Sequence, residues 1–398
     1  MFITLKHGFF VNLQFRRMYA KMITETTGNE HTALLGKTVE ELGAVVQECG
    51  MPRFAARQIA DWLYRKKIDD IEDMTNLSLI ARQKLAEKWC TGRRGYIDMQ
   101  HSRDHTTKCL FPAIGGGMVE TVYIPEGDRT TVCVSSQVGC KMHCAFCLTG
   151  KQGFTGNLDA ADILNQICSV PNGGTVTNIV FMGQGEPLDN YKNVIKAIEI
   201  LTSDKGGFGM SPKRITLSTC GLLPGLKHFV EDCRCNLAIS LHSPYHDERA
   251  EIMSAEKAYP ISDVVAFLKT CEAFRDTEGK TVREESHQRR LSFEYVLLKG
   301  FNDSPSHAAN TASLLKGLDC RVNVIPFHSY KGAEFSSPTH IDAERFCAQL
   351  TRHGLRATMR RSRGEDISAA CGMLAAKIRN KNASTMAAQH KQQQNGQR

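Results

Sequence analysis

The chain has 398 residues, 41% of them hydrophobic, and a formal net charge of +8. This composition suffices for one large domain and a smaller unit, and the moderate positive charge allows a nucleic-acid partner without requiring one. No apolar run approaches the ~20 residues of a membrane-spanning helix, so we predict a soluble, cytoplasmic protein without a membrane partner. Fifteen cysteines without a secretory signal exclude a short disulfide scaffold and favour reduced thiols used in metal or redox chemistry.

Both ends of the chain are predicted to lie outside the folded domains. Residues 1–34 form a leader whose first part is basic and free of carboxylates. This charge pattern is typical of an organellar transit peptide, but an unstructured leader fits equally well, and Met18 and Met22 are alternative starts. Residues 387–398 are polar and of low complexity, which predicts a disordered tail.

Residues 35–95 are predicted to form a helical accessory domain. Apolar residues recur at helical spacing between Val39 and Trp89, and breaks near Pro52 and Asn76 divide the stretch into three helices. Aromatic side chains at helical spacing usually pack inward, so we expect Trp62 and Trp89 in the core of this domain.

Residues 96–130 are predicted to form a β-hairpin connector. Two β-like runs, Lys108–Phe111 and Met118–Ile124, flank a loop that contains three consecutive glycines. Such a pair of runs around a glycine-rich turn is typical of an antiparallel hairpin.

From 131 to 366, short β-branched runs alternate with helical segments. The strand candidates are Thr131–Ser135, Asn178–Met182, Arg214–Ser218, Asn236–Leu241, Leu291–Leu297, Arg321–Ile325 and Ala357–Arg360. This alternation predicts an α/β fold with a parallel sheet, either open or curled into a barrel. In both arrangements, functional residues collect at the carboxyl ends of the strands.

A C-x3-C-x2-C motif follows the first strand of this repeating part. Cys140, Cys144 and Cys147 could hold three corners of an iron-sulfur cluster and leave one iron open to a substrate. A zinc ion is the alternative, with His143 as a fourth ligand. The next close pair, Cys233 and Cys235, is spaced too tightly for a zinc knuckle, and the cysteines that stand singly are interpreted as small buried residues.

The C-terminal stretch is strongly basic. Its cationic residues are Arg352, Arg356, Arg360, Arg361, Arg363, Lys377, Arg379 and Lys381. They form either a solvated basic face or a surface for a phosphate-bearing partner, and the chemistry of the active site must decide between the two.

Five further motifs accompany the cysteine loop, in a fixed order along the chain. They are Val134-Ser-Ser-Gln-Val-Gly-Cys140, Gly183-Gln-Gly-Glu-Pro-Leu188, Leu217-Ser-Thr-Cys-Gly221, Ile239-Ser-Leu-His-Ser243 and Arg363-Gly-Glu-Asp-Ile-Ser-Ala-Ala-Cys-Gly372. With these motifs the chain resembles, from about Val39 to Ile378, the RlmN-type radical S-adenosylmethionine (SAM) enzymes that methylate C2 of adenine in RNA. The resemblance implies a partial (β/α)6 barrel.

The resemblance also implies the cofactors and their ligands. A [4Fe-4S] cluster would be held by the three cysteines of the loop, and two SAM molecules would be used in each turnover. The residues that match SAM contacts are Gly185, Glu186, Ser218, Ser240, Leu241 and His242. His328 stands where the family pattern has an asparagine, so its contact with SAM is less certain than the others.

Two further cysteines match the residues that handle the methyl group. Cys371, in the C-terminal segment 367–386, would take a methyl group from one SAM, and a radical from a second SAM would activate it for addition to the adenine ring. Cys133 would resolve the covalent adduct by accepting the ring proton and forming a disulfide bond with Cys371. Glu120 matches an acid that moves protons, although an exposed strand carboxylate is the other interpretation.

By resemblance, the RNA partners are 23S rRNA and certain tRNAs, the electron donor is a protein such as flavodoxin or ferredoxin, and the enzyme is a monomer. A related enzyme that methylates C8 of the same rRNA adenosine is the nearest alternative, but Val138 and Pro187 match the C2 group. A zinc-stabilised RNA-binding protein without catalytic activity is the remaining hypothesis.

Overall fold

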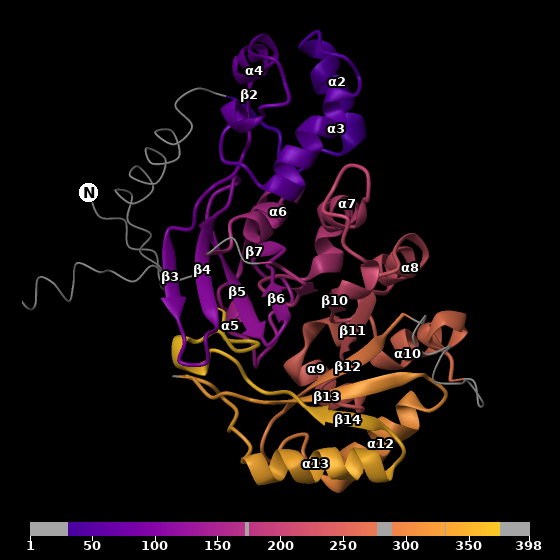
Figure 1. Ribbon diagram of the computed structural model, residues 1–398. Coiled ribbons are helices and arrows are strands. Elements are labelled where there is room, and N and C mark those ends of the chain that lie inside the picture. Colours follow the sequence, from indigo (N-terminus) through magenta and orange to yellow (C-terminus); the bar gives the residue numbers. More distant parts are fainter. Residues whose placement is uncertain (1–30, 172–174, 277–288, 331, 375–398) are drawn as a thin grey trace, which may run out of the picture. The chain divides into compact units, whose positions relative to one another are not determined.

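The computed structural model describes residues 31–171, 175–276, 289–330 and 332–374 (Figure 1). The predicted leader up to residue 30, the predicted tail, and Lys377, Arg379 and Lys381 lie outside the described residues. The chain divides into two compact units between Gly92 and Arg93. Among the described residues, no helix is both long and apolar enough to cross a membrane.

The first unit is mainly helical, as predicted. Its elements are β1 (Thr32–Ala33), α2 (Val39–Glu48), α3 (Ala55–Ala60), the π-helical turn η1 (Asp61–Lys66), the 3-10 turn η2 (Ile71–Asp73), α4 (Leu79–Ala86) and β2 (Trp89–Cys90). Helix α2 begins at a capping box in which Thr38 and Glu41 each accept a hydrogen bond from the other's backbone N–H. Strands β1 and β2 pair in parallel and bring the two ends of the unit together.

The prediction that Trp62 and Trp89 form the core of this unit is wrong. Both side chains are half-buried, and the core consists of aliphatic residues such as Leu42, Ile59 and Leu85. The Trp62 indole N–H donates to Asn76 Oδ1 at 2.5 Å. The Trp62 indole N–H finds this partner at the edge of the core, whose centre is filled by aliphatic side chains. The Trp89 indole N–H has no hydrogen-bond partner among the described residues.

Within the described residues, the second unit is built on a ten-stranded sheet. Seven neighbouring strands are parallel: β6 (Arg129–Cys133), β9 (Asn178–Phe181), β10 (Ile215–Thr219), β11 (Asn236–Ser240), β12 (Leu291–Leu297), β13 (Cys320–Pro326) and β14 (Arg356–Met359). All seven predicted strands are confirmed, with ends that move by one or two residues. The sheet carries the parallel core expected of a partial barrel.

Three antiparallel strands extend this sheet beyond β6. They are β3 (Asp98–His101), β4 (Thr107–Pro112) and β5 (Met118–Glu126). The predicted hairpin is β4 and β5. The structure adds β3, a short and mostly half-buried strand whose sequence has no clear strand pattern. Because β5 also pairs with β6, the hairpin continues the sheet of the barrel.

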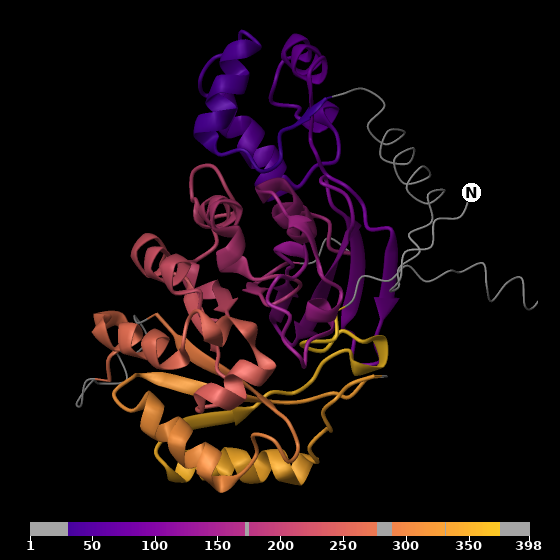
Figure 2. The ribbon, with the colours of Figure 1, turned by 180° about the vertical axis from the view of Figure 1, so that it is seen from behind.

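Helices follow the parallel strands along the outer side of the curved sheet (Figures 1 and 2). They are α5 (Leu148–Lys151), α6 (Ala160–Cys168), α7 (Tyr191–Thr202), α8 (Leu223–Asp232), α9 (His246–Ile252), α10 (Ile261–Thr270), α12 (Pro305–Leu315) and α13 (His340–Arg352). Shorter elements between them are β7 (Gln137–Gly139), β8 (Phe154–Asn157) and the 3-10 turns η4 (Pro187–Asn190), η5 (Pro212–Arg214), η6 (Ser254–Lys257), η7 (Glu272–Phe274) and η8 (Glu365–Ile367).

The two faces of the sheet differ in chemistry, as β12 illustrates. Phe293 and Tyr295 are fully buried, and the Tyr295 ring packs 5.0 Å from that of Phe346 on α13. The alternate residues Ser292 and Glu294 line a cavity instead. Because neighbouring residues of a strand point to opposite faces, the outer face is an apolar core and the inner face is polar.

The segment after β14 returns to the antiparallel strands (Figure 1). Arg363 pairs with Glu126 at 2.6 Å, and Asp366 accepts a hydrogen bond from Ser102 at 2.6 Å. The Lys108 ammonium donates to the Ser368 carbonyl at 3.3 Å. These contacts fix the path of the chain just before Cys371 and thereby deliver that cysteine to the site described next.

Candidate functional site

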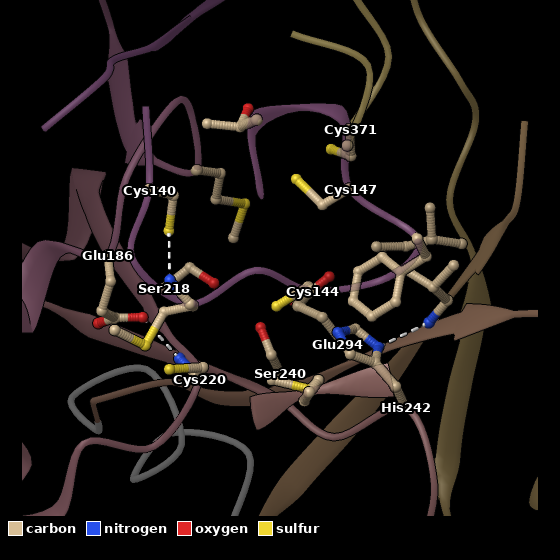
Figure 3. A pocket seen from close by; sticks show the side chains of 18 of the residues that line it. Cys140, Cys144, Cys147, Glu186, Ser218, Cys220, Ser240, His242, Glu294 and Cys371 are labelled. Carbon is tan, nitrogen blue, oxygen red and sulfur yellow. Dashed lines mark hydrogen bonds between the residues drawn. The ribbon is translucent and has the colours of Figure 1, made fainter. Parts of the chain in front are cut away.

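A pocket of ≈160 Å³ lies at the carboxyl ends of the parallel strands (Figure 3). Its wall is formed by the cysteine loop, the loops after β9, β10 and β11, and the C-terminal segment. The predicted site residues that line it are Cys140, Cys144, Cys147, Gly185, Glu186, Ser218, Ser240, His242 and Cys371. The fold thus brings together nine residues that the sequence places on five separate segments.

The three cysteines lie on one loop between β7 and α5. The backbone N–H of Cys147 donates to the Cys144 carbonyl at 3.0 Å, and the Ala145 N–H donates to the Ile252 carbonyl at 3.0 Å. Burial raises the pKa of the Cys140 thiol to about 12 and that of Cys144 well above its usual value. Both thiols are therefore neutral at pH 7 unless a metal cation displaces their protons. The thiols of the three loop cysteines beside an open pocket are a donor set that fits an iron-sulfur cluster.

The other residues considered for a zinc site do not complete one with this loop. His143 is not among the residues that line the pocket, and its Nδ1 lies 3.0 Å from the Gly150 carbonyl oxygen. Cys233 and Cys235 precede β11, at the opposite end of the strands from the loop. Within the part of the chain that the structure describes, no three His, Cys, Asp or Glu side chains converge to hold a single ion.

The loop after β9 is held tightly against the segment after β6. A Cβ atom on Gly183 would lie 2.6 Å from the Val134 carbonyl oxygen, and one on Gly185 would lie 2.5 Å from Gln137 Cβ. Gly185 also has φ +98°, a conformation that favours glycine. The absence of a side chain at both glycines therefore lets this loop pack closely against protein backbone and side chains around the pocket.

Glu186 is fixed by this packing with its carboxylate at the pocket wall. One carboxylate oxygen accepts from the Leu188 N–H at 3.0 Å and the other from the Cys220 N–H at 2.8 Å. Burial raises the pKa of Glu186, and the two backbone hydrogen bonds oppose that rise. Each carboxylate oxygen keeps a second lone pair, so Glu186 can still accept from a ligand.

His242 is a neutral hydrogen-bond donor. Its Nδ1 accepts from the Val296 N–H at 2.9 Å, so the ring proton resides on Nε2. Burial lowers the pKa of His242 to about 3, and the nearby Arg249 guanidinium lowers it further. The ring also meets Phe146 edge-on, with 4.7 Å between ring centroids.

Arg249 is a fully buried residue of α9 that connects two strand ends. Its guanidinium donates to the carbonyls of Cys220 at 2.9 Å, Ser240 at 2.8 Å and Leu241 at 2.9 Å, and it also pairs with Glu256. The first carbonyl follows β10 and the other two end β11. Arg249 thereby sets the spacing of the two loops that carry Ser218, Ser240 and His242.

We expect Arg249→Met to reduce the free energy of unfolding by about 3–5 kcal/mol, because it leaves Glu256 buried without its cation. Urea denaturation measures this loss. Adding Glu256→Gln to the variant removes the stranded charge and should recover part of the stability. A loss below about 1 kcal/mol in the single variant would contradict this account.

Cys371 is attached to the cysteine loop by backbone hydrogen bonds on its carboxyl side. The Leu148 N–H donates to the Gly372 carbonyl at 2.8 Å, and Thr149 Oγ1 donates to the Leu374 carbonyl at 2.8 Å. Leu148 and Thr149 directly follow Cys147. Cys371 and the three loop cysteines are therefore held on one wall of the pocket.

Cys133 lies behind this wall, at the end of β6. It packs in an apolar cluster with Ala369 and Leu374. Burial raises the pKa of its thiol to about 12, the Cys371 thiolate raises it further, and the Arg360 guanidinium lowers it. Cys371 thus lies near enough to Cys133 to influence the charge of its thiol.

Comparisons with known proteins agree with this geometry. Residues 32–91 match the family described as ribosomal RNA large subunit methyltransferase N-terminal domain, and residues 134–311 match the radical SAM superfamily. A protein of Bacteroides thetaiotaomicron named "Probable dual-specificity RNA methyltransferase RlmN" is 51% identical over 341 residues, which cover 86% of this chain and 95% of that protein.

The chain belongs to the RlmN family of radical SAM RNA methyltransferases. The "Dual-specificity RNA methyltransferase RlmN" of Marinobacter nauticus is 37% identical and covers 89% of this chain and 95% of that protein. A crystal structure of a radical SAM methyltransferase from Sphaerobacter thermophilus superposes with a TM-score of 0.79 at 38% identity, over 87% of this chain and 100% of that one. The family and the fold predicted from the sequence are confirmed, and membership of the superfamily implies a [4Fe-4S] cluster and SAM.

The structure places four of the predicted RlmN site residues outside the pocket wall. Cys133 lies behind it, and Leu241 is fully buried. His328 contacts Ser362, and its Nε2 lies 3.7 Å from Glu365 Oε1. Glu120 is buried and pairs with Lys108 at 2.9 Å, so its interpretation as an exposed carboxylate is wrong. Their roles in the reaction stay predictions.

Sequence reasoning missed several pocket residues of this RlmN-family chain, including Cys220, Glu294 and Arg360. Cys220 was interpreted as a small buried residue, whereas it is buried and also lines the pocket. Glu294 and Arg360 lie on the inner face of β12 and just after β14, with Arg360 Nη1 3.6 Å from Glu294 Oε2. The Cys371 thiolate raises the pKa of the Arg360 guanidinium, as does Glu294. The alternation along β12 was the signal that could have identified Glu294.

Proposed function

We propose that this chain methylates C2 of an adenosine in 23S rRNA and in certain tRNAs, through S-methylcysteine at Cys371 and a covalent RNA adduct that Cys133 resolves. The observation that carries the proposal is the position of Cys371, which lines the same pocket as Cys140, Cys144 and Cys147. A methyl group on Cys371 would face the space where the cluster and SAM are expected.

In this proposal the three loop cysteines hold a [4Fe-4S] cluster and the strand-end loops hold SAM. Glu186 accepts hydrogen bonds from the SAM amino group, since its two oxygens are oriented by backbone N–H groups. Ser218, Ser240 and the Nε2–H of His242 supply further polar contacts at the wall. The bound cluster and a second SAM molecule supply the radical that removes hydrogen from the S-methyl group.

Cys371 carries the carbon that is transferred. It first takes a methyl group from one SAM molecule, which leaves as S-adenosylhomocysteine, so its sulfur must be accessible. The residue is exposed, unlike Cys133. After hydrogen removal, the carbon on Cys371 bonds to C2 of adenine and joins the protein to the RNA.

Cys133 releases the product in this proposal. The addition leaves an unpaired electron on the adenine ring, which would pass to the cluster held by the loop cysteines as the Cys133 thiolate takes the proton from C2. The Cys133 sulfur then attacks the sulfur of Cys371. The S–S bond forms, the bond between the Cys371 sulfur and the transferred carbon breaks with its electron pair on that carbon, and the proton that Cys133 carried completes the methyl group. The resulting disulfide needs two electrons from a thiol reductant before the next turnover.

The rate of product release should rise with pH. Burial raises the pKa of the Cys133 thiol to about 12. Below that pKa, the thiolate fraction rises about tenfold for each pH unit, so adduct decay should accelerate about 100-fold from pH 7 to pH 9. Quenched time courses of the adduct, separated by denaturing gel, measure this. A decay rate that does not change with pH would remove Cys133 from the step.

The proposal extends to the partners and the location of the enzyme. One electron for each radical would come from a small redox protein such as flavodoxin or ferredoxin. The enzyme would act as a monomer in the cytoplasm, where the two kinds of RNA are found.

The test is mass spectrometry of nucleosides from RNA treated with anaerobically reconstituted protein, SAM and a reductant. We expect 2-methyladenosine. Appearance of 8-methyladenosine would instead assign the enzyme to the C8 branch. Stoichiometric zinc without iron and sulfide would end the enzymatic proposal in favour of a non-catalytic RNA-binding protein.

A further inference from the structure

A second cavity, of ≈430 Å³, lies inside the partial barrel. Its wall is formed by residues of the parallel strands β6 and β9 to β14 and by the adjoining end of β5. Closed barrels of this size are usually filled by layers of side chains. Here the inner positions carry short polar residues such as Thr216, Ser292 and Thr358, which leave the lumen open.

The second cavity adjoins the pocket that holds the reactive cysteines. Met182, Glu294 and Arg360 line both spaces. A ligand that enters the second cavity therefore reaches the Cys371 side of the pocket without crossing the loop that holds the cluster.

The second cavity is strongly cationic. Among the described residues that line it, seven are Lys or Arg and two, Glu126 and Glu294, are acids. Both acids are engaged, Glu126 with Arg363 at 2.6 Å and Glu294 with Arg360 at 3.6 Å.

Three of the arginines have charges that this unit leaves uncompensated. All three are exposed: Arg290 and Arg321 lie at the amino ends of β12 and β13, and Arg361 lies just beyond the carboxyl end of β14. Over the ranges that the structure describes, no carboxylate forms an ion pair with any of them. Such a concentration of cations in a concave surface attracts anions and holds phosphate oxygens through paired N–H donors.

The inner end of the second cavity also offers an acceptor. Glu294 is 4% exposed, and its Oε2 lies 3.6 Å from Arg360 Nη1, beyond hydrogen-bond distance, so that among the described residues this oxygen has an ion-pair partner but no hydrogen-bond donor. A buried acceptor without a donor costs free energy unless a ligand supplies one. The exocyclic amino group of adenine is such a donor.

We propose that the second cavity receives the RNA strand that carries the target adenosine, with phosphates bound by Arg290, Arg321 and Arg361 and the base directed toward Glu294. This inference rests on the proposed function, since it supplies the route by which that substrate reaches Cys371. The inference also divides the basic residues of the C-terminal stretch into those that would bind phosphate and those that would not. Arg361 lines the second cavity, whereas Arg352 and Arg356 do not, and Arg356 pairs with Asp319.

The test compares two triple variants that each remove three positive charges. The first is Arg290→Ala, Arg321→Ala and Arg361→Ala. The matched control is Lys205→Ala, Lys316→Ala and Arg352→Ala, three exposed cations that line neither cavity. Fluorescence anisotropy measures the binding of a short RNA hairpin with an adenosine in its loop, over a series of salt concentrations.

We expect the slope of log K against log salt to fall by about 2 in the first variant, at ~0.7 for each phosphate contact with single-stranded RNA. If the two proteins bind RNA equally at 1 M salt, the first variant should bind about 100-fold more weakly than the unaltered protein at 0.1 M salt. The control variant should keep the slope of the unaltered protein, and exchanging the three arginines for lysine should keep most of it. Equal losses in both triple variants, or no loss in the first, would overturn the proposal.

Two further measurements separate the remaining outcomes. Adenosine monophosphate serves as a probe for a free nucleotide. If the first triple variant no longer binds adenosine monophosphate but still binds RNA, the second cavity is a mononucleotide site and the proposal is wrong. Melting temperature and iron content verify that each variant is folded. SAM cleavage by the unaltered protein without RNA tests the proposed function separately, because its failure would leave the RNA-binding result intact.

Discussion

Cys371→Ala should reduce methyl transfer to the background measured without enzyme, while the protein keeps its iron and sulfide. The variant removes the only sulfur at that position on the pocket wall that could carry the methyl group, whereas the three cluster cysteines remain in place. The backbone contacts of Gly372 and Leu374 with the loop do not involve the Cys371 side chain. Tritium transfer from labelled SAM to RNA measures the loss.

The control for this variant is Cys347→Ala, which changes a half-buried cysteine of α13 that does not line the pocket. It should retain methyl transfer close to that of the unaltered protein. Methyl transfer by Cys371→Ala above background would remove Cys371 from the mechanism, because the methyl group would then reach the adenine carbon without being carried on this residue.

Cys133→Ala should trap the enzyme on its RNA. Without the Cys133 sulfur, the bond between Cys371 and the transferred carbon has no resolving nucleophile, so the adduct should persist through denaturing electrophoresis. Removal of this one side chain should thus replace turnover by formation of a stoichiometric covalent complex with RNA. The effect on release should far exceed the small packing cost of removing one sulfur atom from the cluster with Ala369 and Leu374.

The double variant Cys133→Ala, Cys371→Ala is the control for this experiment. It should yield RNA-free protein, because no S-methyl carrier remains. If Cys133→Ala alone also yields only RNA-free protein, with the cluster intact, the resolving role assigned to Cys133 is wrong.

The strands of the barrel were predictable because their signal is local. Each of the seven parallel strands is a short β-branched run followed by a helical segment, and such a pattern survives in almost any tertiary context. Strand β3 was missed because its residues are half-buried and polar, and it exists only because β4 offers it a partner. The tryptophans were misplaced for a related reason, since periodicity locates a helix face but does not say which side chains fill its centre.

The site was predicted unevenly. The cysteine loop and Glu186 lie in continuous motifs at the ends of strands, so their types and spacing were enough to suggest their chemistry. Arg249 carries no such motif, and its importance appears only where its guanidinium meets the carbonyls of two strand ends. Glu120 was singled out from the sequence, but its interpretation as an exposed carboxylate was wrong. The side chain is buried and pairs with Lys108 across the hairpin, a contact that the sequence does not reveal.

By itself, the sequence determined the order of the elements, the cysteine loop that is predicted to hold a cluster, and the resemblance that the comparisons confirmed. Only the tertiary structure decided that the segment with Cys371 returns to the cysteine loop, that Cys133 is buried behind it, and that the barrel encloses a second, cationic cavity. The physical reason is the range of the interactions. Periodicity and motifs reflect contacts within a few residues, whereas burial, charge pairing and cavity shape arise from side chains that meet only after the sheet has curved.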